Sequence, residues 1–148
     1  MLAVRRLLLS LVLSTVALAG AALLAPSVAA ACSCAWYDVP SARQQATHVF
    51  EGVLVRVLPA SGNTPERAEF HVDRVWKGTV TRVFAVQATV GLTMCPPHLE
   101  VGQRYILYTS GPADAPRVAS CSRFAAGPSL VTERRELGAP LQTLTPRP

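Results

Sequence analysis

The sequence predicts a small, mostly β domain in which five short antiparallel strands close into a barrel with flanking helices. Short runs rich in Val, Phe, Thr and Tyr recur with turn residues between them, which is the pattern of antiparallel strands. Closing such strands into a barrel removes the exposed edges of the sheet. The four cysteines indicate a domain cross-linked by two disulfides. A β-sandwich made from the same strands is the main alternative.

The first 31 residues have the pattern of a secretory signal. Basic residues precede an apolar run that ends at Pro26, and three alanines at 29–31 give an A-x-A cleavage pattern. We therefore expect residues 1–31 to be a signal peptide and the protein to be secreted. Two alternatives remain. The apolar run is nearly long enough to be an uncleaved membrane anchor, and a lipid on Cys32 would hold the protein at the cell envelope.

The cysteines all lie after this segment, at positions 32, 34, 95 and 121. An even number of cysteines in a small exported protein indicates disulfides, and four cysteines allow three pairings. A zinc site made of four cysteines normally brings its ligands as two C-x₂₋₄-C pairs. Here one pair is separated by a single residue and the other two cysteines stand alone, which favours disulfides.

The domain, expected at residues 32–138, begins with a short helix and its strongest strand. Residues 42–46 are good helix formers, and Asp38 or Ser41 can cap them. The strand at 48–57 has Val49, Val53, Val55 and Val57 on one face, which Glu51 interrupts, and its glycine indicates a bulge.

The remaining elements are separated by turn residues. A helix is expected at 129–137, because a proline precedes it, a glycine follows it and its apolar residues recur at helical spacing. Residues 139–148 are expected to be a disordered tail. Four further strands are expected at 68–76, 81–90, 105–109 and 117–121.

Several features occur in an order that resembles one known family. They are Cys32-Ser33-Cys34, the helix bearing Gln44-Gln45, the strand 49–57, Val75-Trp76-Lys77-Gly78, and finally Cys95 and Cys121. This order resembles the netrin-like domain of the tissue inhibitors of metalloproteinases, in a short secreted bacterial form. The resemblance spans the chain from Cys32 to about Gly138. It implies a five-stranded OB-fold barrel, with disulfides Cys32–Cys95 and Cys34–Cys121.

The same resemblance implies inhibition of a secreted zinc metalloprotease. In the animal inhibitors the N-terminal cysteine chelates the protease zinc through its free α-amine and backbone carbonyl, which assigns that role to Cys32. Such a chelate occupies the open position of a catalytic zinc and displaces its water. Ser33 would point into the specificity pocket of the protease. The rest of the contact ridge would be Cys34, Ala35, Trp36, Met94 and Pro96.

Other function classes are less well supported. The chain has no H-E-x-x-H, no G-x-S-x-G and no Gly-rich phosphate loop, so we expect no enzyme and no cofactor. A net charge of +5 with scattered basic residues does not favour nucleic-acid binding. We expect a monomer that contacts a membrane only if Cys32 is lipidated or the signal is uncleaved. A non-inhibitory binding module of the cell envelope is the alternative function.

For several polar and aromatic residues we expect a structural role. Trp36, Trp76, Tyr105 and Tyr108 are expected to pack in the core, with a surface for stacking ligands as the alternative. His48 is expected at the surface or with a satisfied ring, and residues 133–136 (Glu-Arg-Arg-Glu) are expected on a solvated helix face.

Overall fold

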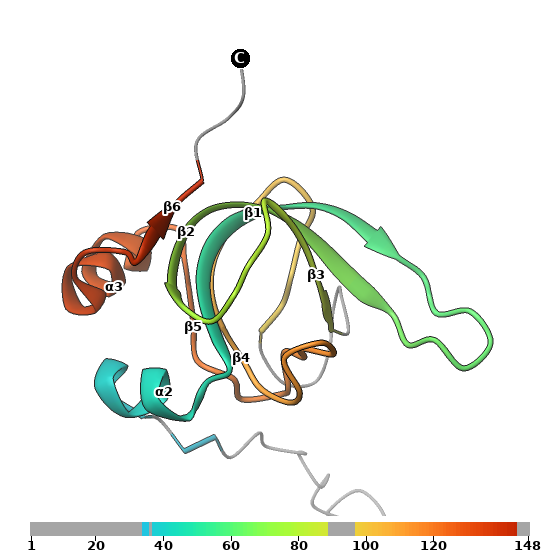
Figure 1. Ribbon diagram of the computed structural model, residues 1–148, viewed down its shortest axis with the longest axis horizontal. Coiled ribbons are helices and arrows are strands. Elements are labelled where there is room, and N and C mark those ends of the chain that lie inside the picture. The colour runs from blue at the N-terminus through green and yellow to red at the C-terminus, as the bar shows by residue number, and fades with distance from the viewer. Residues whose placement is uncertain (1–33, 36, 89–96, 145–148) are drawn as a thin grey trace, which may run out of the picture. The chain divides into compact units, whose positions relative to one another are not determined.

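The computed structural model describes residues 34–35, 37–88 and 97–144, which form a six-stranded antiparallel sheet and two helices (Figure 1). The strands lie in the order β3-β2-β1-β4-β5, and β6 pairs with β2. The mostly β fold with flanking helices is confirmed, and the paired strands form an open sheet. In chain order the elements are α2 (Val39–Gln45), β1 (His48–Leu58), β2 (Arg67–Lys77), β3 (Val83–Gln87), β4 (Arg104–Thr109), β5 (Phe124–Ala126), α3 (Ser129–Leu137) and β6 (Gln142–Thr143).

Strands β1 and β2 form a long hairpin that extends beyond the rest of the sheet (Figure 1). Their register shifts between Glu51 and Gly52, which confirms the bulge expected there. A Cβ atom on Gly52 would lie 2.6 Å from the carbonyl oxygen of His71. The backbones approach so closely that only glycine fits at this point of the strand.

Helix α2 begins at Val39, which agrees with Asp38 among the two expected caps. The Asp38 side chain accepts a hydrogen bond of 2.9 Å from the Ser41 backbone N–H, so Asp38 is the N-cap residue. At the other end the Lys77 ammonium donates to the carbonyl oxygens of Arg43 and Gln44, at 2.8 and 2.7 Å. This cation satisfies carbonyls that a helix C-terminus leaves without partners.

The strand expected at 117–121 is not formed. Only Arg117 pairs, through a parallel bridge to Gln87 and an antiparallel bridge to Ser110. The chain then turns, because the Ser122 backbone N–H bonds the carbonyl of Ala119 and the Ser122 hydroxyl accepts from the Ala119 N–H, both at 3.0 Å. The last strand alongside β4 is instead β5, which sequence patterning missed.

Two other boundaries differ from expectation. Strand β3 is shorter than the expected 81–90, of which residues 89–90 lie outside the described residues. The tail expected to be disordered is placed as far as Leu144: the β6 pairs hold it against β2, and the Leu144 N–H donates to the Asp73 carbonyl at 2.8 Å. Residues 145–148 lie outside the described residues.

The core has two clusters on opposite faces of the sheet. Along β4 the side chains alternate: Tyr105 and Leu107 belong to one cluster, and Ile106 and Tyr108 to the other. The second cluster lies under both helices, which Figure 1 shows on the same side of the sheet. Trp76, Tyr105 and Tyr108 are 1%, 3% and 4% exposed, which confirms them as core residues.

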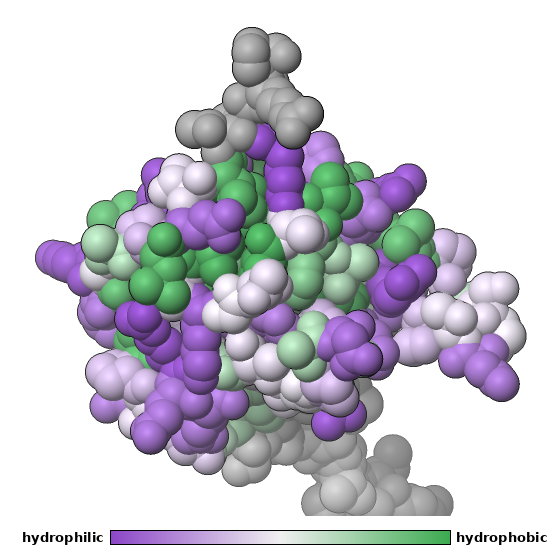
Figure 2. Space-filling model, viewed as in Figure 1, coloured by the Kyte–Doolittle hydropathy of each residue, from purple (hydrophilic) through white to green (hydrophobic). Residues whose placement is uncertain are grey.

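The surface mixes polar and apolar side chains. On the face that Figure 2 shows, hydrophobic and hydrophilic residues are interspersed. The large hydrophobic residues that are most exposed come from separate segments of the chain. They are Tyr37, Val83, Val101, Val131 and Leu141. None of the helices that the structure describes has the length and apolar character needed to cross a membrane.

Candidate functional site

The first described residue is anchored to the domain by a disulfide. Cys34 is bonded to Cys121, with 5.3 Å between the two Cα atoms and 87 positions between them in the chain. This confirms one of the two expected disulfides. Cys121 lies in the turn before β5 and has a φ of 66°. That left-handed conformation is uncommon for a residue with a side chain.

Most of the expected protease-contact ridge lies outside the described residues. Cys34 is half-buried and Ala35 is exposed, so both lie at the edge of the domain. Of the expected ridge, the structure therefore places Cys34, through its disulfide, and Ala35. The expected contact residues outside the described part are Cys32, Ser33, Trp36, Met94 and Pro96, together with the cysteine at 95.

The described residues on both sides of 89–96 are held by hydrogen bonds or by burial in the core. Before this segment, Gln87 exchanges backbone hydrogen bonds of 2.8 Å with Pro116 and Val118, three positions from the cysteine of the disulfide. After it, Leu99 is buried in the core. Gln87, at the end of β3, therefore lies beside the segment 116–118 that leads to Cys121.

A buried ionic network joins helix α3 to Arg123, two positions after Cys121. Glu133 of α3 is 5% exposed, although a solvated position was expected. Leu130, Glu133 and Leu137 share one helix face, and that face packs on the sheet. Arg123 donates to both carboxylate oxygens of Glu133 at 2.6 Å, and the Tyr108 hydroxyl donates to one of them at 2.7 Å.

This network connects α3 to the segment before α2. The third donor of Arg123, Nη1, binds the carbonyl oxygen of Tyr37 at 2.7 Å. Burial and the Glu133 carboxylate raise the pKa of the Tyr108 hydroxyl, which keeps it a hydrogen-bond donor. Tyr37, Tyr108 and Arg123 line a small pocket of about 240 Å³ together with the Cys121 loop. Arg123 thus links the segment that follows Cys34 to the segment that follows Cys121.

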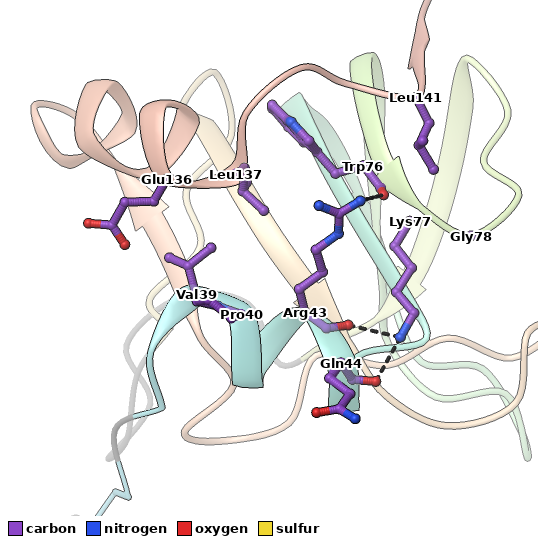
Figure 3. A pocket seen from close by; sticks show the side chains of 10 residues that line it. All are labelled: Val39, Pro40, Arg43, Gln44, Trp76, Lys77, Gly78, Glu136, Leu137 and Leu141. Atoms are coloured by element: carbon purple, nitrogen blue, oxygen red, sulfur yellow. Dashed lines mark hydrogen bonds between the residues drawn. The ribbon is translucent and has the colours of Figure 1, made fainter.

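A larger pocket lies between the two helices and the end of β2 (Figure 3). Its volume is about 510 Å³, within the range of small-molecule sites. The apolar side chains of Val39, Leu137 and Leu141 line it, and Arg43 crosses it to donate to the Trp76 carbonyl at 2.9 Å. The remaining lining residues are Pro40, Gln44, Trp76, Lys77, Gly78 and Glu136.

The Trp76 ring is fixed beside this pocket. Its Nε1–H donates to the carbonyl oxygen of Gly138 at 2.8 Å, just after α3. Arg43 and Lys77 place positive charge in a mostly apolar lining that also includes Gln44 and Glu136. Sequence reasoning assigned these two residues no role. The one signal available was the strand end Val75-Trp76-Lys77-Gly78, where a large aromatic and a cation are adjacent.

Metal ligands are not gathered in the described part of the chain. Residues 34–35, 37–88 and 97–144 contain no group of three His, Cys, Asp or Glu side chains that could hold an ion. His48 is 1% exposed, and its Nδ1 lies 3.0 Å from the Thr109 hydroxyl oxygen, so its ring is satisfied as expected. Burial lowers the pKa of His48.

Comparison with known proteins adds no relative. No family model matches the sequence, and no curated protein is significantly similar to it.

Proposed function

We propose that this protein is a secreted inhibitor of zinc metalloproteases that chelates the protease zinc through the α-amine and carbonyl of Cys32. The observation that carries the proposal is the Cys34–Cys121 disulfide. It anchors the chain two residues after the proposed mature terminus. A terminus anchored so closely loses little further conformational entropy when it enters an active site.

The proposal includes an OB-fold barrel. In its support, β1 lies between β2 and β4, and β3 lies at the far side of β2. The single bridging residue Arg117 pairs with Gln87 at the end of β3 and with Ser110 just after β4. In the proposed barrel, this residue would act as a minimal fifth strand through which the open sheet closes.

The proposal also includes a second disulfide, Cys32–Cys95. Two facts support this pairing. Cys32 is two positions from Cys34, and Gln87, eight positions before Cys95, bonds the segment 116–118 that leads to Cys121. Closing the chain between Cys32 and Cys95 contributes about 4 kcal/mol to stability in the loop-entropy model. The two bonds together would present residues 32–36 and the chain around Met94 and Pro96 as one rigid ridge.

The chelation chemistry requires a free amine. An α-amine has a pKa of about 8, so a Lewis acid binds its neutral form near neutral pH. The amine and carbonyl of one residue form a five-membered ring with zinc and displace the attacking water. Any residue in front of Cys32 converts the amine into an amide that cannot donate a lone pair. Export and signal cleavage after Ala31 are therefore part of the mechanism.

The test compares two forms of the same domain against secreted zinc endopeptidases with a fluorogenic peptide. One form carries an N-terminal extension that ends in a site for a specific serine protease, and the other is released from it to start at Cys32. We expect dose-dependent inhibition by the released form only, with equal melting temperatures for both. Equal inhibition by both forms, or none by either across the proteases, would overturn the proposal.

A second candidate is a non-inhibitory binding module of the cell envelope. The 510 Å³ pocket beside Trp76 favours it, because apolar pockets with a few fixed polar groups are typical of ligand sites. A lipid on Cys32 would fit this second function and would exclude chelation. Intact-mass analysis of the exported protein distinguishes a free Cys32 amine from a lipidated one.

A further inference from the structure

Glu51 is a fully buried carboxylate surrounded by arginines from three elements. Its side chain is 0% exposed and lies on β1. Arg134 of α3 donates to both of its oxygens, at 2.5 and 2.8 Å, while Arg74 of β2 donates at 2.9 Å and Arg104 of β4 at 3.2 Å. Burial alone would raise the pKa of Glu51, but the bonds and charges of Arg134 and Arg74 hold it below the ordinary value. The Glu51 carboxylate is therefore ionised, and both of its oxygens accept hydrogen bonds from arginines.

The same three arginines also face solvent. The side chains of Arg74, Arg104 and Arg134 are 41%, 38% and 35% exposed. They line a pocket of about 290 Å³, together with Glu51, Asp73, Thr143 and Leu144. A guanidinium has five N–H donors, and the bonds to Glu51 use one or two of them on each arginine. Donors on all three side chains therefore remain for a group in the pocket.

The charge of the pocket is positive. Among the described residues that line it, the carboxylates are those of Glu51 and Asp73, and Asp73 accepts a hydrogen bond from Arg104. Three guanidinium groups against two carboxylates leave one positive charge in excess. Because Glu51 lies buried beneath the arginines, a ligand from solvent meets the guanidinium groups first. Asp73, one-third exposed, is the one negative group at the rim.

We propose that this pocket binds a phosphate or sulfate group. Planar guanidinium forks match the paired oxygens of such anions, and bonds between two charged groups are the strongest hydrogen bonds in proteins. The framework is fixed in advance, because Glu51 holds the arginines together before the anion arrives. The anion would use the solvent-facing donors and leave the bonds to Glu51 intact.

This site is separate from the proposed protease ridge. Arg104 begins β4, and Thr109 ends it close to the loop that carries the disulfide. Five residues of strand span about 16 Å, so an anion at Arg104 leaves that loop free. The anion site does not depend on the proposed inhibitory function, and the two can be tested independently.

The test is calorimetric titration of the full mature domain with inorganic phosphate, at an ionic strength held constant with sodium chloride. Arg74→Gln removes one guanidinium while leaving the other bonds to Glu51, and should raise the dissociation constant about tenfold, the loss expected for one charge-assisted hydrogen bond. Asp73→Asn removes the competing carboxylate and should tighten binding severalfold. The matched control is Arg135→Gln, which removes the same charge from an exposed position next to Arg134.

Each outcome decides the proposal. Weaker binding in Arg74→Gln, tighter binding in Asp73→Asn and no change in the control support it, with circular dichroism showing that every variant is folded. Absence of binding by the wild type, or equal losses in Arg74→Gln and Arg135→Gln, overturns it.

Parallel titration with phenyl phosphate identifies the source of the group. Equal affinity indicates a phosphate ester of a larger molecule, and binding of inorganic phosphate alone indicates a free anion.

Discussion

Arg134 of α3 donates two hydrogen bonds to the carboxylate of Glu51 on β1, 83 residues earlier in the chain. The pair fastens the last helix to the first strand. Glu51 lies on the strand face that packs against the helices, beside the buried Val49 two positions earlier. A charge in that position is stable only because three arginines converge on it.

Replacing Glu51 by Gln should therefore lower the free energy of unfolding by about 3 kcal/mol, the loss typical of breaking a buried ion pair. The physical cause is the three guanidinium groups, which would converge on a neutral amide that can accept at only one oxygen. Urea unfolding monitored by tryptophan fluorescence measures the change. The control is Glu69→Gln, whose partner Arg56 is 63% exposed. A surface pair of that kind contributes less than about 1 kcal/mol, so equal losses in both variants would contradict this account.

The fold was largely predictable wherever a local pattern was strong. The first two strands and the final helix were expected within a few residues, because valine alternation, caps and the flanking glycine are local signals. Strand β5 was missed because three residues, Phe124–Ala126, carry no alternation. The expected strand at 117–121 failed because a turn closed by Ser122, and a disulfide, override its β propensity.

The charged clusters were less predictable. The arginines around Glu51 lie 23, 53 and 83 positions away in sequence, so no local spacing identifies them. One signal was present: a glutamate that interrupts an apolar strand face requires a buried partner. Glu133 gave no such signal, because a run of four charged residues on a short helix resembles an exposed face.

Acidification should reduce stability through His48. Burial lowers the pKa of this residue in the folded protein below the 6.5 of the free side chain. The unfolded chain therefore takes up a proton first as the pH falls through 6.5, and the free energy of unfolding falls with it, by at most about 1.4 kcal/mol per pH unit. Above pH 6.5 the contribution is fully present.

The measurement for His48 is urea unfolding at several pH values between 7.5 and about 5, above the range in which carboxylates titrate. In His48→Asn the fall of stability below pH 6.5 should be much reduced, whatever the change in overall stability. His71→Asn, at an exposed position of β2, is the control and should keep the wild-type profile. An unchanged profile in His48→Asn would show that another group carries the pH dependence.

The network around Glu133 should respond unequally to the loss of its two partners. Arg123→Gln leaves a carboxylate that is 5% exposed without its cation, and should cost about 3 kcal/mol. Tyr108→Phe removes one hydrogen bond and keeps the cation, so about 1 kcal/mol is expected. Thermal and urea unfolding rank the two variants. A larger loss for Tyr108→Phe would mean that the hydroxyl hydrogen bond, not the ion pair, dominates.

The backbone conformation of Cys121 predicts a stabilising substitution once the disulfide is gone. Replacing both Cys34 and Cys121 by Ser removes a cross-link between residues 87 positions apart, which should cost about 4.5 kcal/mol in the loop-entropy model. With φ at 66°, a serine at position 121 also keeps an unfavourable left-handed conformation. Pairing Cys34→Ser with Cys121→Gly should therefore recover about 1 kcal/mol relative to the double serine variant.

Unfolding by urea under reducing conditions compares these two variants without a contribution from the bond itself. If the glycine variant is no more stable than the serine variant, the left-handed turn is imposed by the disulfide and relaxes when the bond is removed. If it is more stable, the turn at 119–122 is a property of the loop, held by the Ser122 hydrogen bonds. In that case Cys121 stays in place to receive Cys34 during oxidative folding. The chain then forms the anchor of its N-terminal segment from a prearranged site.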